Sequence, residues 1–152
     1  MIAALLICAS LNVNPAFDAA SDSLPGWTLV GPARHVRDAD GRQYVLADEG
    51  AVKSDLFPVA GGTEIKVTLE GSGPKYLRKR KKVWVAVAFF GTEEEARAKG
   101  AQWKLARPKL EVATSEVSEK SETYPVPPDA KWCRLTIRGG SAYRCEAELV
   151  KK

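Results

Sequence analysis

The chain has 152 residues, of which 45% are hydrophobic and 28% are charged, a balance that favours one globular domain and excludes a largely disordered chain. The formal net charge of +4 comes from 23 Lys and Arg against 19 Asp and Glu. Six of these cations lie within residues 75–82, and without them the balance is 17 against 19, or −2. The basic character therefore belongs to one stretch, which excludes a general nucleic-acid-binding surface.

Residues 1–10 (MIAALLICAS) form an apolar run that is too short to span a bilayer. The small residues Ala9 and Ser10 suit cleavage by signal peptidase. We therefore expect a signal-peptide-like segment, a single mature domain over residues 11–152, and a secreted or periplasmic location. No positively charged residue precedes the apolar run, and a first β-strand at the domain edge is the alternative.

From residue 11 onward, short alternating segments are separated by clusters of Gly, Pro and Asp. This pattern is typical of an antiparallel β-sandwich and not of βαβ units. Trp27 follows a tight Pro-Gly turn, so we expect its ring to fill the core beneath the N-terminal loop. Residues 65–69 and 133–137 alternate as half-buried strands, and the glycines at 139–140 predict a turn after the second of them.

Residues 82–90 (KVWVAVAFF) give the strongest strand signal, and because both faces are apolar we expect this strand inside a sheet. The basic stretch 71–82 precedes it. Such a run can attract polyanions, and a solvated loop that prevents edge pairing is the alternative. Tyr76 is its one aromatic residue, so the stretch lacks a stacking platform and no specific nucleic-acid partner is expected.

Residues 92–104 are predicted to form one short surface helix, with Thr92 as its N-cap and Glu95 three residues later. Ala96 and Trp103 would share one face of this helix, so Trp103 could lie across the outer face of the central strand. After it, residues 105–121 suit an edge strand and a connection.

Cys133 and Cys145 form an even pair in a domain that we expect to be exported. Both have inward parity on the last two strands, and each lies six residues from Gly139. Antiparallel strands joined by that turn would bring the cysteines level, so we predict a disulfide. Two buried free thiols are the alternative.

Several motifs together resemble galactose-binding-like jelly-roll domains, the group that includes many carbohydrate-binding modules. Residues 12–18 (NVNPAFD) resemble the Asn-Pro-x-Phe-Glu/Asp opening of these domains, and Gly26 with Trp27 resembles the Gly-Trp pair that follows. Further similar segments are residues 41–47, 54–69, 126–137 and 143–149. The resemblance covers most of residues 12–150, is weakest over 91–124, and implies an all-β jelly-roll sandwich.

The same resemblance implies a structural calcium ion, for which Asp18 matches the acidic residue of the opening motif. Cys145 occupies the position where the closing aspartate would align, and a thiol is a poor ligand for this hard cation. Glu146 would point to the other face. We therefore expect no cofactor, with calcium at Asp18 as the open alternative.

The resemblance also implies a secreted, non-catalytic domain that binds a polysaccharide or other glycan, and that is appended to or acts beside a carbohydrate-active enzyme. In such binding, aromatic rings stack on a pyranose while polar groups bond its hydroxyls. The candidate ligand residues are Trp84, Phe90, Trp103, Arg134 and Thr136. A structural or adhesion domain that binds protein without sugar affinity is the alternative, as is burial of the aromatic face beneath the helix.

No residue pattern indicates catalysis. The sequence has no nucleophile elbow, P-loop or dinucleotide-binding motif, and His35 is its one histidine, with no metal-ligand spacing around it. Two carboxylates placed by the fold could still hydrolyse a glycoside on such a frame. We expect a domain that is not an enzyme.

Overall fold

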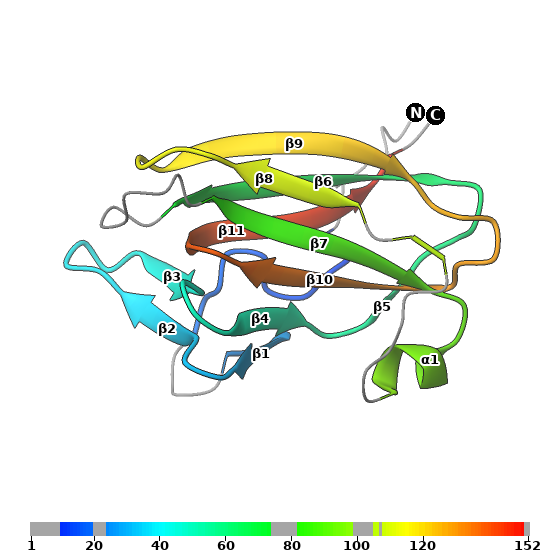
Figure 1. Cartoon of the computed structure of the whole chain (residues 1–152), viewed down its shortest axis with the longest axis horizontal. Helices are drawn as coiled ribbons and strands as arrows, with labels where there is room; N and C mark the ends of the chain where they lie inside the picture. The colour runs from blue at the N-terminus through cyan, green and yellow to red at the C-terminus, as the bar shows by residue number, and fades with distance from the viewer. Residues whose placement is uncertain (1–9, 20–23, 74–81, 99–104, 107, 151–152) are drawn as a thin grey trace, which may run out of the picture.

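The computed structural model describes residues 10–19, 24–73, 82–98, 105–106 and 108–150, which form two antiparallel sheets packed face to face (Figure 1). The six-stranded sheet has the order β1 (Trp27–Val30), β4 (Ala51–Ser54), β10 (Trp132–Arg138), β7 (Val83–Phe90) and β8 (Lys109–Val112), with β5 (Phe57–Pro58) beside β10. The five-stranded sheet has the order β2 (Arg34–Arg37), β3 (Gln43–Leu46), β11 (Ser141–Leu149), β6 (Glu64–Ser72) and β9 (Ser118–Pro125). The predicted all-β sandwich is confirmed.

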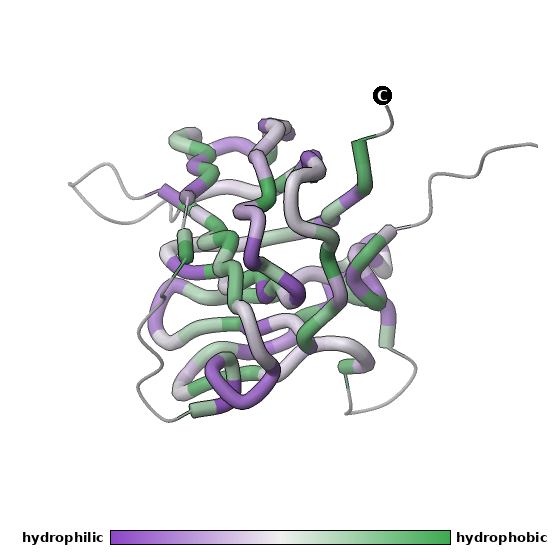
Figure 2. The backbone as a smooth tube through the Cα atoms, turned by 90° about the vertical axis from the view of Figure 1, so that its right-hand side faces the viewer, coloured by the Kyte–Doolittle hydropathy of each residue, from purple (hydrophilic) through white to green (hydrophobic). Residues whose placement is uncertain are grey.

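The core lies between the two sheets and is built from alternate residues of each strand, an alternation that Figure 2 shows as changes of hydropathy along the tube. Strand β7 lies between β10 and β8, as expected for a strand that is apolar on both faces. Its inward residues, Val83, Val85, Val87 and Phe89, are fully buried. The expectation of an interior strand at this position is confirmed.

Helix α1 (Glu93–Arg97) is shorter than the predicted helix over residues 92–104. Thr92 caps its N-terminus as expected, since its hydroxyl accepts a hydrogen bond from the Glu95 N–H at 3.1 Å. The helix ends because Ala98 has an extended backbone, and residues 99–104 lie outside the described part of the chain. No helix among the described residues is long and apolar enough to cross a membrane.

The N-terminal segment runs along β11, where it extends the five-stranded sheet beyond the end of β3. Leu11 donates to the Ala147 carbonyl, and the buried Asn12 side chain bonds both the Cys145 carbonyl and the Ala147 N–H. Ser10 bridges to Glu148. The predicted signal segment otherwise falls on residues 1–9, outside the described residues.

Asn14 closes the loop that follows. Its side chain accepts from the Asp18 N–H and donates to the Asp18 and Pro25 carbonyls. This fixes Phe17 in the core, 5.0 Å from the Trp27 ring, and the Trp27 indole donates to the Asn14 carbonyl at 2.9 Å. The prediction that Trp27 fills the core is confirmed, because the residue is only 6% exposed.

The predicted disulfide is wrong, because Cys133 and Cys145 are both free and buried. Their inward parity is as expected, since both belong to the core. The chain turns at Gly139, however, and β11 then enters the opposite sheet instead of pairing with β10. Facing sheets are separated by about 10 Å, so the cysteines are not neighbours across one ladder.

We expect neither core thiol to react with iodoacetamide in the folded protein. Both are inaccessible, and burial raises the pKa of each thiol well above its usual range, which removes the reactive thiolate. Both should react once the chain is unfolded without reductant, and peptide mass mapping would measure this. If the cysteines of the unfolded chain react only after a reductant is added, the protein contains the disulfide after all.

Candidate functional site

The predicted ligand face is the outer face of β7 and β10, and α1 covers one end of it. Phe90 is only 3% exposed and forms a buried cluster with Ala88 and Ala96. Ala86, on the same face of β7, is 1% exposed. A ring enclosed in this way cannot stack on a sugar, so the structure corrects the interpretation of Phe90 as a binding platform.

The remaining predicted residues lie on or near this face. Arg134 donates from Nη1 to the Ala96 carbonyl at 3.0 Å, and its burial lowers the pKa of the guanidinium. Thr136 is buried. Trp84 is half-buried, with the Lys109 ammonium 4.6 Å from its ring centroid, while Trp103 lies outside the described residues. Trp84 therefore stays a predicted ligand contact, although the Lys109 ammonium already lies over its ring.

Asp18 lies in a structural loop. Its N–H and its carbonyl both bond the Asn14 side chain, and the residue is exposed. Within the described parts of the chain, no three His, Cys, Asp or Glu side chains gather in a way that could hold a metal ion. The calcium alternative therefore stays a prediction.

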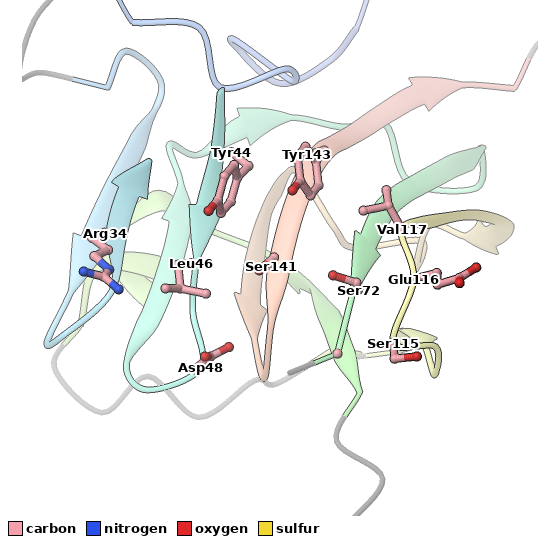
Figure 3. Close-up of a pocket in the computed structure, with 11 residues that line it drawn as sticks. Arg34, Tyr44, Leu46, Asp48, Ser72, Ser115, Glu116, Val117, Ser141 and Tyr143 are labelled. Atoms are coloured by element: carbon pink, nitrogen blue, oxygen red, sulfur yellow. The ribbon is translucent and has the colours of Figure 1, made fainter. Parts of the chain in front are cut away.

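A cleft of about 570 Å³ opens on the outer face of the other, five-stranded sheet (Figure 3). Its residues come from strands β2, β3, β6 and β11, from the loops just after β3 and β6, and from the segment between β8 and β9. They are Arg34, Tyr44, Leu46, Asp48, Ser72, Gly73, Ser115, Glu116, Val117, Ser141 and Tyr143. Residues distant in sequence thus form one hollow surface.

Strand parity places the aromatic side chains of the cleft. Val45 and Ala142 are register partners and point into the core, so Tyr44 and Tyr143 point outward. Their rings stack with centroids 4.8 Å apart and planes inclined by 25°. The phenolic oxygens point toward Leu46 and Ser141 inside the cleft (Figure 3).

The Arg42 guanidinium carbon lies 4.5 Å from the Tyr143 ring centroid, and Arg42 also pairs with Glu70. This contact fixes the tyrosine pair from the side of β6. Burial and the neighbouring Tyr44 hydroxyl raise the pKa of Tyr143, so its phenol keeps its proton at neutral pH and stays a hydrogen-bond donor.

The polar side chains around the tyrosine pair are available to a ligand. Among the described residues, the side chains of Arg34, Asp48 and Glu116 make no ion pair or hydrogen bond with the protein, and neither do the two phenolic hydroxyls. The cleft thus combines an apolar ring surface with free donors and acceptors, which is the composition of a small-molecule or oligomer site.

The sequence analysis missed this cleft, although both of its tyrosines lie in segments, residues 41–47 and 143–149, that it matched to jelly-roll domains. The available signal was an outward-facing tyrosine in each segment. That signal becomes useful only when β3 is known to pair with β11, and this long-range pairing cannot be derived from local alternation.

No family model matches the sequence, and no curated protein matches it. Solved structures do match in fold. The family 22 module and catalytic domain of Clostridium thermocellum xylanase 10B, solved with xylohexaose, matches 95% of this chain with a TM-score of 0.57 and 14% identity. This chain spans 28% of the length of that structure. A phage tailspike protein and an arabinofuranosidase also match, and this chain spans 22% and 26% of their respective lengths.

Other matches are single binding modules that align over almost their whole length. The C-terminal family 22 carbohydrate-binding module of the same xylanase matches 93% of this chain and 95% of its own, with a TM-score of 0.52 and 12% identity. A family 4 module matches 93% of this chain and 97% of its own length, with a TM-score of 0.51 and 15% identity. The chain therefore has the β-sandwich fold of non-catalytic carbohydrate-binding modules of families 4 and 22.

Proposed function

We propose that this protein is a non-catalytic carbohydrate-binding domain that holds a glycan in the cleft of the five-stranded sheet. The observation that carries the proposal is the stacked pair of Tyr44 and Tyr143, surrounded by side chains whose polar groups have no partner among the described residues. The binding site is thereby moved from the Trp84 face to the opposite sheet.

The chemistry of the cleft fits a sugar. A pyranose presents apolar C–H groups on its faces and hydroxyls around its rim, so it needs an apolar surface beside several donors and acceptors. The tyrosine rings and Leu46 supply the apolar surface. The carboxylates of Asp48 and Glu116 can accept hydrogen bonds from sugar hydroxyls, and Arg34 can donate.

The comparisons support this proposal at the level of fold. Three structures that match over 87% or more of their own length are carbohydrate-binding modules. One of them is named as the xylan-binding domain of a Paenibacillus barcinonensis enzyme, with a TM-score of 0.50 and 11% identity. In the xylanase match, the module is joined to a catalytic domain. We infer that this domain likewise acts appended to, or beside, a carbohydrate-active enzyme, in a secreted or periplasmic setting.

Affinity electrophoresis through gels that contain xylan, β-glucan, arabinan or cellulose derivatives tests the proposal. We expect retardation by at least one neutral polysaccharide, and about tenfold weaker binding by Tyr143→Ala, because a lost stacking contact costs on the order of 1 kcal/mol or more. Trp84→Ala is the matched control, since it removes a half-buried aromatic residue from the other sheet. It should bind as the wild type does.

The opposite results have distinct meanings. Loss of binding in Trp84→Ala with retention in Tyr143→Ala would return the site to the face that the sequence predicted. A wild-type protein that no polysaccharide retards would favour the structural or adhesion domain. Thermal melting of each variant shows whether it is folded, so that lost binding can be assigned to the site.

A further inference from the structure

Charged residues are distributed unequally between the two sheets. The strands of the six-stranded sheet carry four cations and one carboxylate, a balance of +3. Those of the five-stranded sheet carry five cations and six carboxylates, a balance of −1. The four cations of the first sheet are Lys53, Lys109, Arg134 and Arg138, which we call the cationic strip.

Register places the whole strip on the outer face of this sheet. Thr136 is the partner of Lys53 on one side and of Ala86 on the other, and Ala86 is the partner of Lys109. Lys53 and Lys109 thus lie in one cross-strand row, three strand spacings or about 14 Å apart. Arg134 and Arg138 lie two residues before and after Thr136 on β10, about 13 Å from each other.

No ion pair among the described residues neutralises the positive charge of the strip. Glu111, the one carboxylate on these strands, pairs with Lys82 at 2.8 Å, and Lys109 acts on it only through its charge, as a smaller cause of the lowered pKa of Glu111. No strip residue forms an ion pair with a described carboxylate. Arg134 and Arg138 donate to backbone carbonyls, and Asp55 acts on Arg134 only through its charge, which partly opposes the lowering of the Arg134 pKa by burial and by Arg97.

The residues between these charges offer little surface of their own. Ala86 and Thr136, which occupy the middle of the row, are short and almost completely covered. The described aromatic residues of this face have other contacts, because the Lys109 ammonium lies over the Trp84 ring and Trp132 packs against the Phe90 cluster. The face can therefore offer positive charge to a polymer, but not stacking to bases.

We propose that the cationic strip is a second binding surface, for a carboxylated polysaccharide, on the opposite side of the sandwich from the cleft. Lys supplies a point charge, and the planar guanidinium of Arg matches a carboxylate with two parallel hydrogen bonds. Four cations over an area about 14 Å wide match a polymer with one charge on each sugar. Duplex DNA, with one charge for every ~1.7 Å of its axis, is much more densely charged.

Affinity electrophoresis at low salt in gels that contain alginate tests this surface, with dextran, dextran sulfate and duplex DNA as comparison ligands. The double variant Lys53→Gln/Lys109→Gln removes two charges from the strip. Its matched control, Lys66→Gln/Lys120→Gln, removes two charges from the strands of the other sheet. Both variants keep the basic stretch 75–82, so any attraction from that stretch is common to them.

We expect alginate to retard the wild type and the control to a similar degree, and the strip variant to bind about tenfold more weakly, because it loses two of the four charges of the strip. Binding should fall steeply between 50 and 300 mM NaCl because the charges are exposed.

Equal weakening of both variants would show that net charge or the basic stretch binds alginate, and would overturn the proposal. So would unchanged binding by the strip variant, or tighter strip-dependent binding to dextran sulfate or DNA than to alginate. Binding of neutral polysaccharide by the strip variant is a separate readout of the cleft, so the two surfaces can fail independently. Melting temperatures within about 2 °C of the wild type are expected for both variants, as for surface substitutions in general.

Discussion

Gly139→Ala should lower the free energy of unfolding by roughly 3–5 kcal/mol, because it combines a strained backbone with a direct collision. Gly139 has φ +90°, and a Cβ there would lie 2.2 Å from the Lys82 carbonyl oxygen. The backbone has little freedom to move away. The Gly139 N–H donates to the Ala47 carbonyl at 2.7 Å, and the Ala47 N–H donates to Gly140 at 2.8 Å.

Gly41→Ala is the matched control. Gly41 has φ +83°, and no atom lies within 4 Å of the position that its Cβ would take. This variant should therefore lose only the ~1–2 kcal/mol that a left-handed backbone costs an L-residue. Urea unfolding of both variants measures the difference. Equal losses would mean that the approach of Gly139 to Lys82 contributes nothing.

The position of Gly139 matters for the cleft as well as for the fold. This turn carries the chain from β10 in one sheet to β11 in the other, and Ser141 and Tyr143 follow directly. The two hydrogen bonds to Ala47 anchor the turn just beyond the end of β3, the strand that holds Tyr44. One turn thus helps to set both sides of the cleft.

The fold class could be predicted because its signals are local. Period-two alternation and turn residues lie within a few positions of each other, and the apolar faces of residues 82–90 required a strand with neighbours on both sides. The burial of Trp27 was predictable for the same reason. The Asn-Pro turn and the Pro-Gly turn fix the chain locally, and the core receives Phe17 and Trp27.

The candidate site depended on information that is not local. A Gly-Gly turn can join paired strands of one sheet or carry the chain to a facing sheet, and nothing within residues 133–145 distinguishes these outcomes. The sequence analysis assumed that the turn joins paired strands of one sheet, and this assumption led to the wrong disulfide between Cys133 and Cys145. The tyrosine pair was missed for a related reason, since its two strands become neighbours only through the topology of the whole sheet.

The sequence predicted the start of helix α1 correctly but not its end. The capping residues at its start were read correctly, because Thr92 and Glu95 act within one turn. Its end was not, because Ala98 is a good helix former that nevertheless adopts an extended backbone. Even five residues of helix are enough to bury Ala96 on Phe90, which covers the Phe90 end of the face where the sequence had placed the ligand.

The second large effect is expected at Phe17. Its side chain is fully buried against Trp27, so Phe17→Ala leaves a cavity and should cost about 3–5 kcal/mol of unfolding free energy. Relief of backbone strain does not offset this cost, because residue 17 has φ 58° and alanine is strained in that conformation too. Trp27 should also lose its fixed surroundings, which near-ultraviolet circular dichroism would detect in the fraction that remains folded.

Val13→Ala provides the comparison from the same loop. Val13 is 59% exposed, so its truncation should change the unfolding free energy by no more than about 0.5 kcal/mol. Chemical denaturation of the two variants side by side separates core packing from loop composition. A loss of less than about 1 kcal/mol of unfolding free energy in Phe17→Ala would contradict this expectation, because it would mean that the loop collapses into the space of the ring. The hydrogen bonds of Asn14 to Asp18 and Pro25 would then be the feature that holds this end of the sandwich together.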